Sequence, residues 1–521
     1  MILHLKKRLS KDSVILLLTV LFVMLTLILR NIQLTVENKN RVVIYGDVLH
    51  YYAFLPAILV YHDLHLDFVA KSPGKFSDRF WPVVAPNGKY VIMTTMGMSI
   101  MYSPFVVPVH YFLKLTGQDA DGFSSAYNYA LIVASLFYTL LALILLIKIL
   151  RQYYSSKTIS IVLILLTLGT NLIHYNTREP AFSHVFSFFL IIWLTYCIDK
   201  YYKNNSIYQA VLVGFILGLI TLVRPTNAVV MIIIPFWKIG SIYELKMRIT
   251  TLLKNWHHIL IIGVVILITW LPQIIYWKST AGTFFFNGYG DGGKFFFGNP
   301  QLINILFSYR KGWLLYTPSM IIAIIGFYWL YKNKRHLFFP IVIYFVINTW
   351  ILASWWLWWF GGSYGNRAFI DMYGLLAFPI AAFIDHLNFS KYRCLRLAPI
   401  FLLFVFVAHN LFQLQQYHNG AIHYVSMTKE AYWESFGKLK PQGNFYELLV
   451  FPDYELAKKG IYPKPEVKVP EKIEKNVQFY EKQLRNSPEM IRMLEEKAIK
   501  ENISLDSMIK RDALWLYKNK K

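Results

Sequence analysis

Long apolar runs recur along this chain and limit what it can fold into. Stretches of about 18 to 20 hydrophobic residues, the length that crosses a bilayer core as a helix, appear repeatedly between Val14 and His409. Hydrophobic residues make up 56% of the 521 positions and charged residues only 16%, so a water-soluble domain would leave large apolar patches exposed. Alternating strand patterns do not occur in the sequence, which argues against a spanning β-barrel. The sequence therefore predicts an all-α polytopic membrane protein.

About eleven crossings fit the hydrophobic pattern. The first is a retained anchor over Val14–Leu29, because no small-residue cleavage site follows the basic segment Met1–Asp12. Two further apolar stretches, Val48–Val60 and Ile100–Leu115, contain prolines and are expected to lie at the interface rather than to cross the membrane. The remaining crossings are expected near residues 130–150, 159–173, 185–198, 210–223, 228–237, 259–276, 314–331, 338–358, 375–384 and 397–411.

The distribution of charge predicts the orientation of these helices. Lys and Arg number 53 against 29 Asp and Glu, and with this set of crossings the basic connections all fall on one side, as the positive-inside rule requires. The N-terminus is therefore predicted to be cytoplasmic, in a multi-pass protein of the plasma (inner) membrane. The basic residues are scattered between apolar runs rather than clustered, so membrane lipids, and not nucleic acid, are the expected partners. The basic connections are 151–157, 200–203, 238–254, 332–335 and 391–396.

The polar segments predict two domains. Residues 1–415 form the membrane domain, and within it residues 31–127 form a long first outer loop that contains the interfacial helices. The odd number of crossings leaves residues 416–521 on the outer, periplasmic side. The charged and amphipathic composition of this tail predicts a small helical extramembrane domain, in which Ser487-Pro488-Glu489 is typical of a helix start and Ser504 of a helix cap.

Side chains able to move a proton or to bind an anion gather in the predicted outer connections. The predicted membrane interiors, by contrast, contain almost no ionisable residues, which argues against a transporter or a pump. The topology is predicted from the charge of the inner loops and not from these side chains. Their convergence on the outer face is therefore partly independent evidence for a site there. The candidate site residues are Asp47, His50, Arg178, Glu179, His184, Arg224, Asn366 and Arg367.

These residue types suit the transfer of a sugar from a polyprenyl phosphate. The acceptor hydroxyl must lose a proton as it attacks the anomeric carbon, and a desolvated carboxylate such as that of Asp47 can take it. The departing lipid phosphate gains charge, which arginine donors stabilise best in a dry site. Asp47 is therefore the expected general base, and Arg224, Arg367 and Arg178 are the expected phosphate ligands.

The layout also resembles the GT-C superfamily of polytopic membrane glycosyltransferases. The resemblance rests on the anchor, the acidic residue that opens the long outer loop, the runs Thr177–His184 and Leu222–Asn227, and the glycine-rich stretch from Gly361 to Arg367. It is similar in particular to the protein O-mannosyltransferase and lipid A aminoarabinose transferase branches. The first outer loop of those families supplies a catalytic Asp, which matches Asp47, whereas the Glu of their usual Asp-Glu pair is replaced by Val48.

The resemblance implies a lipid-linked donor, inversion at the anomeric carbon and no site for a soluble nucleotide sugar. The predicted function is thus transfer of a sugar from a polyprenyl-phosphate donor to the hydroxyl of a glycan, lipid or protein at the outer face of the membrane. Two alternatives stay open. A flippase or transporter of lipid-linked sugars would need charges at mid-membrane depth, and an oligosaccharide ligase or polymerase would use a longer donor.

Five of the eight candidate residues also have a simpler interpretation. Asp47 can cap the helix that follows it, because Asp is a favoured N-cap residue. His50 can orient Asp47 or lie at the membrane interface. The neighbours Arg178 and Glu179 can be a surface ion pair, and Arg224 can be an interfacial arginine whose head group reaches water.

The sequence predicts no cofactor and gives no support for a metal site. Asp119 and Asp121 match a short acidic signature of nucleotide-sugar transferases, but a turn explains two nearby acids better. The outer loop Phe284–Asn299, rich in phenylalanine and glycine, is expected to be a mobile lid or an acceptor contact, although its glycines fit plain turns as well.

Overall fold

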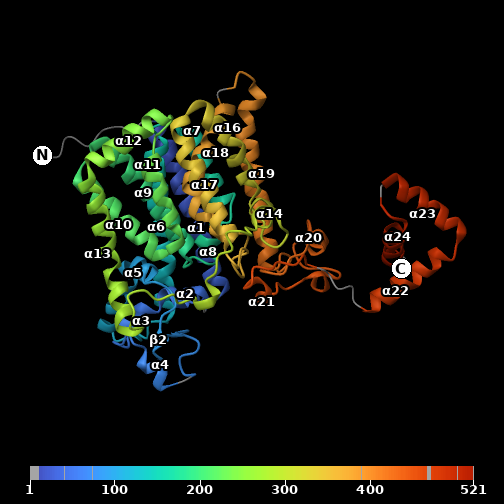
Figure 1. Ribbon diagram of the computed structural model, residues 1–521, viewed down its shortest axis with the longest axis horizontal. Coiled ribbons are helices and arrows are strands. Elements are labelled where there is room, and N and C mark those ends of the chain that lie inside the picture. Colours follow the sequence, from blue (N-terminus) through green and yellow to red (C-terminus); the bar gives the residue numbers. More distant parts are fainter. Residues whose placement is uncertain are drawn as a thin grey trace.

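The computed structural model is built almost entirely of helices (Figure 1). It describes residues 11–39, 41–72, 74–388, 390–465, 471–501 and 503–519, so most of the basic segment Met1–Asp12 lies outside the described residues. Seven helices in these ranges are long and apolar enough to cross a membrane. They are α1 (Lys11–Glu37), α6 (Ser125–Leu150), α9 (Ser183–Asn204), α13 (Trp256–Thr280), α17 (Arg335–Ser354), the continuous pair η4 (Arg367–Met372) and α18 (Tyr373–Asn388), and α19 (Arg393–His418).

The remaining predicted crossings are shorter or interrupted. Ser156–Leu168 (α7) and Ile207–Val223 (α10) are apolar helices of 13 and 17 residues. The helix expected near 159–173 stops at Gly169, and a separate short helix, α8 (Leu172–Thr177), follows it. Eleven full crossings are therefore a prediction that the helix lengths support only in part.

Prolines account for two further interruptions. The segment expected to cross near 228–237 is a 3-10 helix, η1 (Pro225–Ile232), followed by the four-residue helix α11 (Ile233–Phe236). The segment expected near 314–331 is divided into α15 (Trp313–Tyr316), η3 (Pro318–Met320) and α16 (Ile321–Asn333). Proline lacks a backbone N–H and fixes φ, so Pro225 and Pro318 begin new helices instead of continuing the preceding ones.

The outer surface of the bundle carries large apolar side chains. On α13, Leu260, Leu267 and Leu271 are each at least half exposed, and only 11% of the most apolar window of this helix is buried. The same kind of surface lies on α1, where Leu18 and Leu25 are exposed. Such a continuous apolar face is unfavourable in water and suits contact with lipid.

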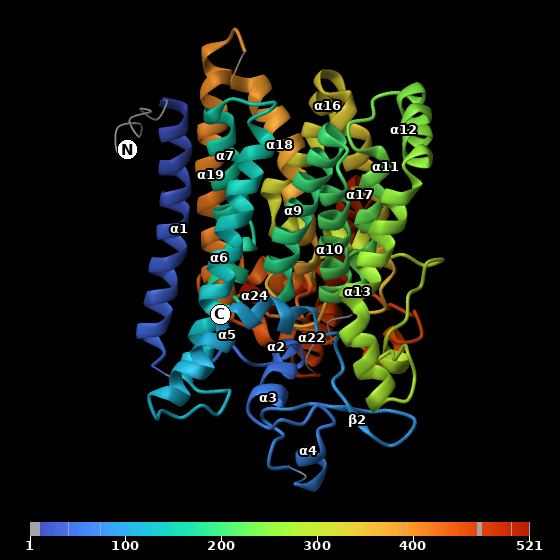
Figure 2. The same cartoon turned by 90° about the vertical axis from the view of Figure 1, so that its left-hand side faces the viewer.

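The two ends of the bundle differ in charge and in structure. The amphipathic helix α12 (Ile242–Lys254), which lies in the basic connection 238–254, is at the end where α1 begins (Figure 2). The short helices α2 (Asp47–Tyr52), α3 (Phe54–Leu59) and α4 (Asp67–Lys71) are at the opposite end. The basic connection 238–254 and the short helices that follow Asp47 therefore lie at opposite ends of the bundle.

The first outer loop packs on the end of α13. Its two-residue strands β1 (Val83–Val84) and β2 (Tyr90–Val91) pair antiparallel, and a small core joins Phe80 and Ile92 of the loop to Tyr276 and Trp277 of α13. The longest helix of the loop, α5 (Gly97–Leu115), contains two prolines and is not among the seven candidate spans of the described residues, so its interfacial position stays a prediction.

The C-terminal region contains two sets of short helices. After α19 the chain forms α20 (Lys429–Ser435), η5 (Phe445–Leu448) and α21 (Tyr454–Ala457) beside the bundle. The helices α22 (Glu471–Arg485), α23 (Pro488–Glu501) and α24 (Leu505–Asn519) pack on one another and are drawn apart from the bundle (Figure 1). Pro488 begins α23, and Ser504 Oγ accepts a hydrogen bond from Ser507 N at 3.2 Å, as the sequence predicted.

Candidate functional site

Asp47 and Arg367 form an ion pair although 320 positions separate them in the sequence. Arg367 Nη2 donates a hydrogen bond of 2.6 Å to Asp47 Oδ2. Water reaches 45% of the Asp47 side-chain surface but only 12% of that of Arg367. The Asp47 side chain is therefore partly exposed, whereas the guanidinium is held inside the protein.

The glycine-rich loop before η4 positions Arg367. Gly365 has φ +60°, a conformation that favours glycine. The buried Asn366 side chain caps η4, because its Oδ1 accepts a hydrogen bond from Ala368 N while its Nδ2 donates to the Trp358 carbonyl. Asn366, predicted as a substrate ligand, is thus engaged at both ends of its amide in holding the backbone that precedes Arg367.

Asp47 does not cap its own helix. Helix α2 begins at Asp47, but its N-cap is Gly46, and no side-chain hydrogen bond caps this end. Burial on its own would raise the pKa of Asp47, but the charge of Arg367 and its hydrogen bond outweigh this effect and hold the pKa below its ordinary value. Asp47 is therefore ionised at neutral pH and is bonded to an arginine.

His50 lies one helical turn after Asp47. Its ring packs edge-on against Trp81, with the ring centroids 5.7 Å apart. Burial lowers the pKa of His50, and the negative charge of Asp47 opposes this only in part. His50 is accordingly a neutral ring beside the carboxylate at neutral pH.

A second polar cluster surrounds the buried Asp371. His184 Nδ1 donates to Asp371 Oδ1 at 2.9 Å, and Asn227 Nδ2 donates to Oδ2 at 2.9 Å. Arg224 Nε lies 3.4 Å from the same Oδ2, and its Nη1 lies 3.0 Å from His184 Nε2. Asp371 follows Arg367 by one turn of η4, so a single short helix carries Arg367 and the acid that holds Arg224.

One of the two arginines keeps a donor for a further partner. Arg367 Nε is buried and has no hydrogen-bond partner in the part of the chain that the structure describes, whereas Arg224 Nε lies against Asp371. Buried N–H groups are normally bonded, so the Arg367 donor favours an anionic ligand.

The phenylalanine-rich loop Phe284–Asn299 lies near the charged groups of the site. Burial and then the charge of Asp47 raise the pKa of Tyr289 in this loop, while the positive charges of Arg224 and Arg367 lower it. All three charged groups therefore act on one loop residue. The loop also packs closely on its neighbours, since an added Cβ at Gly288 would clash with the Met93 carbonyl oxygen and Trp356 N donates a hydrogen bond to the carbonyl of Lys294.

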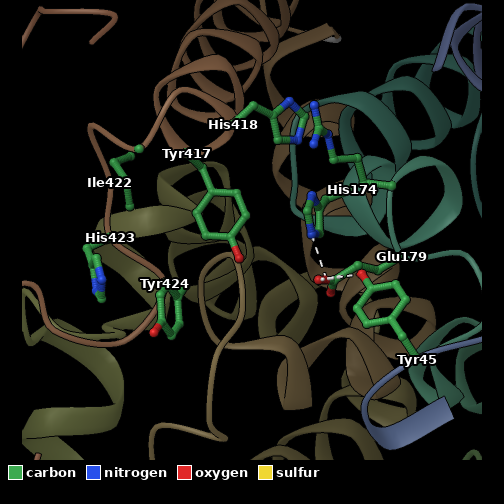
Figure 3. Close-up of a pocket in the computed structure, with 10 residues that line it drawn as sticks. Tyr45, His174, Glu179, Tyr417, His418, Ile422, His423 and Tyr424 are labelled. Atoms are coloured by element: carbon green, nitrogen blue, oxygen red, sulfur yellow. Dashed lines mark hydrogen bonds and ion pairs between the residues drawn. The ribbon is translucent and has the colours of Figure 1, made fainter. Parts of the chain in front are cut away.

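A cavity of about 290 Å³ lies at the same end of the bundle (Figure 3). Arg178 and Glu179 line it, together with His174 and Tyr45. The Tyr45 hydroxyl donates to Glu179 Oε1 at 3.4 Å, and His174 Nε2 lies 3.4 Å from Glu179 Oε2. Within the described residues Glu179 is thus paired with His174 and Tyr45 rather than with its neighbour Arg178.

Two buried charged residues at the site escaped the sequence analysis. Lys311 Nζ donates to the Ser363 carbonyl, and burial together with the charge of Arg367 holds the pKa of Lys311 well below its ordinary value. Asp371 is the other. The sequence signal for Asp371 is a lone acid in the apolar run that follows Arg367, whereas Lys311 stands in a polar turn that is ordinarily solvated.

The acidic pair in the first outer loop shapes a turn. Asp121 Oδ1 accepts hydrogen bonds from Phe123 N and Ser124 N, at 2.8 and 2.7 Å, and its other oxygen lies 3.4 Å from Arg79. Across the described ranges no group of three or more His, Cys, Asp or Glu side chains is arranged to hold a metal ion.

Comparison with known proteins gives partial structural likenesses. No family model matches the sequence, and no curated protein matches it. The apo crystal structure of the Archaeoglobus fulgidus oligosaccharyltransferase superposes with a TM-score of 0.45 at 12% identity, over 96% of this chain and 60% of that chain. The oligosaccharyltransferase AglB of the same organism, in complex with an inhibitory peptide and a dolichol-phosphate, gives 0.40 at 12% identity, over 81% and 60%.

A third structure of the Archaeoglobus fulgidus enzyme, in complex with zinc and sulfate, gives a TM-score of 0.40 at 13% identity, over 81% of this chain and 57% of that one. This chain therefore spans about 60% of the length of the solved structures that it resembles. The proposal that follows rests on the residues of the site.

Proposed function

We propose that this protein is a membrane glycosyltransferase of the GT-C type that moves a sugar from a polyprenyl-phosphate donor to an acceptor hydroxyl. The ion pair between Asp47 and Arg367, with Arg224 held beside it by Asp371, is the observation that carries the proposal. It brings a proton acceptor and two anion-binding groups together at one end of an apolar helical bundle. In this reaction Asp47 is the general base, and Arg367 and Arg224 bind the donor phosphate.

The reaction balances with these groups alone. The acceptor oxygen forms a bond to the anomeric carbon while the bond from that carbon to the phosphate oxygen breaks. The proton of the acceptor hydroxyl goes to the Asp47 carboxylate, and the electron pair of the broken bond leaves on the polyprenyl phosphate. Attack opposite the leaving group inverts the anomeric carbon.

The resting ion pair gives the donor a way to activate the base. In the absence of donor, Arg367 lowers the pKa of Asp47 and so makes it a weak base. A donor phosphate bound to Arg367 supplies the negative charge that Asp47 supplied before, which frees the carboxylate and raises its pKa. Asp47 becomes a stronger base only when the sugar to be transferred is in place.

The surrounding structure supplies the other requirements of the reaction. Exposed apolar side chains on α13 offer a surface for an isoprenoid tail, and the loop Phe284–Asn299 can shield the phosphate from water. On this proposal residues 1–415 form the catalytic membrane domain, with the N-terminus in the cytoplasm. The site and residues 416–521 then lie on the outer side of the inner membrane.

A transfer assay with the purified chain tests this function directly. The chain is incubated with a panel of polyprenyl-phosphate-linked hexoses and a mixture of candidate glycan, lipid and peptide acceptors. Both the release of polyprenyl phosphate and the formation of labelled product are measured. We expect stoichiometric release and transfer. A protein that moves the same lipids across proteoliposomes without releasing polyprenyl phosphate would be a flippase, and use of oligosaccharide donors alone would indicate a ligase or polymerase.

A further inference from the structure

The cavity shown in Figure 3 is assembled from three distant parts of the chain. Tyr45 comes from the segment before α2, His174 and Glu179 come from the turn between α7 and α9, and Tyr417 comes from the last turn of α19. Tyr424 contributes from the segment after α19. A space built from such separate elements requires the whole membrane domain to be folded, which is typical of a binding site and not of a surface groove.

Aromatic rings form one part of its wall. The rings of Tyr417 and Tyr424 face the cavity in Figure 3, and Tyr417 packs edge-on against His174 with centroids 5.3 Å apart. Tyr424 is 49% exposed, so its ring is available to a ligand that enters from water. Aromatic faces next to polar groups suit a ligand that has both C–H faces and hydroxyl groups.

Polar atoms without partners form the other part. His174 Nδ1 and both ring nitrogens of His418 are buried and lack a hydrogen-bond partner within the described residues, whereas His174 Nε2 and Glu179 Oε2 pair with each other at 3.4 Å. His174 is only 1% exposed. Buried polar groups are almost always hydrogen-bonded, so three atoms of this kind beside one cavity indicate a ligand that supplies hydrogen-bonding groups.

The cavity wall holds a carboxylate as well as a guanidinium. Burial alone would raise the pKa of Glu179, but His174, Arg367 and Lys311 together hold it below its ordinary value, so the carboxylate carries a negative charge in the cavity wall. Arg178 also lines the cavity and is exposed. A phosphate placed among these groups would face the carboxylate, whereas a sugar hydroxyl could donate to it.

We propose that this cavity binds one sugar unit of the acceptor, so that the enzyme glycosylates a saccharide and not a protein or a simple lipid. The inference rests on the proposed function for the role of this sugar as acceptor. The cavity volume of about 290 Å³ suits a polar ligand as small as one sugar unit. Tyr45 links the two sites, because it lines the cavity and stands two positions before Asp47.

Binding of free saccharides by the full chain tests the proposal independently of transfer. The protein in lipid nanodiscs is applied to an array of glycans, and apparent affinities are compared between the unaltered chain and its variants. We expect binding to a defined set of glycans, with affinity about tenfold lower for Glu179→Gln and for Tyr424→Ala.

Matched controls separate loss of binding from loss of folding. Glu430→Gln and Tyr243→Ala change the same residue types at exposed positions outside the cavity and should leave the affinity unchanged. Tyr424 is half exposed, so its replacement keeps the fold where a change at the buried His174 would not. Unchanged glycan affinity in both cavity variants, or binding of inorganic pyrophosphate but of no glycan, would overturn the proposal.

The two proposals fail in different ways. Glycan binding that depends on Glu179, without transfer from any polyprenyl-phosphate donor, would remove the transferase and leave the saccharide site. Transfer to a peptide or a simple lipid, with an acceptor KM that Glu179→Gln and Tyr424→Ala do not change, would remove the saccharide site and leave the transferase.

Discussion

The contact between Asp47 and Arg367 sets the strength of the proposed base. The guanidinium holds the pKa of Asp47 below its ordinary value, so the carboxylate stays ionised at every pH at which the protein would work. The same pairing stabilises the folded state at pH values above the ordinary carboxyl pKa. That contribution is lost as the pH falls through the lowered pKa of Asp47.

A pH profile of transfer tests this relation. In the unaltered chain we expect kcat/KM to fall on the acid side below the ordinary pKa of an Asp, because the free enzyme must have Asp47 ionised. Arg367→Gln should lower kcat/KM by about 100-fold and move this acid limb to higher pH, since the group that lowers the pKa of Asp47 is gone. Arg396→Gln, at an exposed position in a predicted inner connection, should leave the profile in place. An acid limb that stays fixed in Arg367→Gln would contradict the pairing.

The type of a residue and its position in the sequence predict some of the charged residues of the site but not others. The sequence points to Asp47 and Arg367 because reactive side chains on the predicted outer connections are few and the predicted topology places them on one face. Which acid pairs with which arginine is a property of tertiary structure, so the sequence points to Glu179 beside Arg178 and not to Asp371. Asn366 was named for its place beside Arg367, but its amide is used within the loop.

At the scale of elements, η4 joins the two halves of the site. Its first residue pairs with Asp47, and its Asp371 pairs with residues of α9 and of the turn between α10 and η1. A shift of this short helix would therefore move both phosphate ligands together.

Removal of the Asp371 charge tests whether this residue holds the two halves of the site together. Asp371→Asn leaves the partly buried Arg224 without its acid, and we expect the free energy of unfolding to fall by about 3 kcal/mol, seen as a lower melting temperature in detergent. Asp78→Asn removes an exposed acid of the first outer loop and should change the melting temperature little. Equal melting temperatures for the two variants would show that Asp371 does not hold the cluster together.

The loop between α13 and α14 (Leu302–Phe307) offers a second test at this scale. Gly288→Ala would place a Cβ in steric clash with the Met93 carbonyl oxygen, so the loop must move away from the first outer loop. We expect faster proteolysis of the loop and transfer reduced by about tenfold, since a displaced lid admits water. Gly292→Ala, where a Cβ meets nothing within 4 Å, is the matched control and should behave as the unaltered chain. Identical behaviour of both variants would contradict a covering role.

Hydropathy predicted the long helices well, because length and apolar content alone define them. The segments 130–150, 185–198 and 259–276 correspond to α6, α9 and α13. It overstated the helices near 228–237 and 314–331, where Pro225 and Pro318 begin new turns and tertiary contacts decide whether a helix continues. An apolar window does not reveal such breaks.

For the whole molecule, the proposal requires the site to lie on the outer side of the membrane. Cys394 is exposed in the predicted inner connection 391–396, whereas Cys197 is buried. An impermeant maleimide added to intact cells should leave Cys394 unlabelled until the cells are permeabilised. A Cys394→Ser chain that carries Lys75→Cys in the first outer loop should be labelled without permeabilisation. Labelling of Cys394 in intact cells would place the site on the cytoplasmic side.

The rate of sugar transfer by Asp47→Asn tests the central claim most directly. The variant keeps the shape of the side chain but cannot accept the proton, so we expect kcat to fall by about 100-fold or more while binding of the polyprenyl-phosphate donor is retained. Purified Asp47→Asn protein that transfers sugar at the rate of the unaltered chain would contradict the assignment of Asp47 as the base.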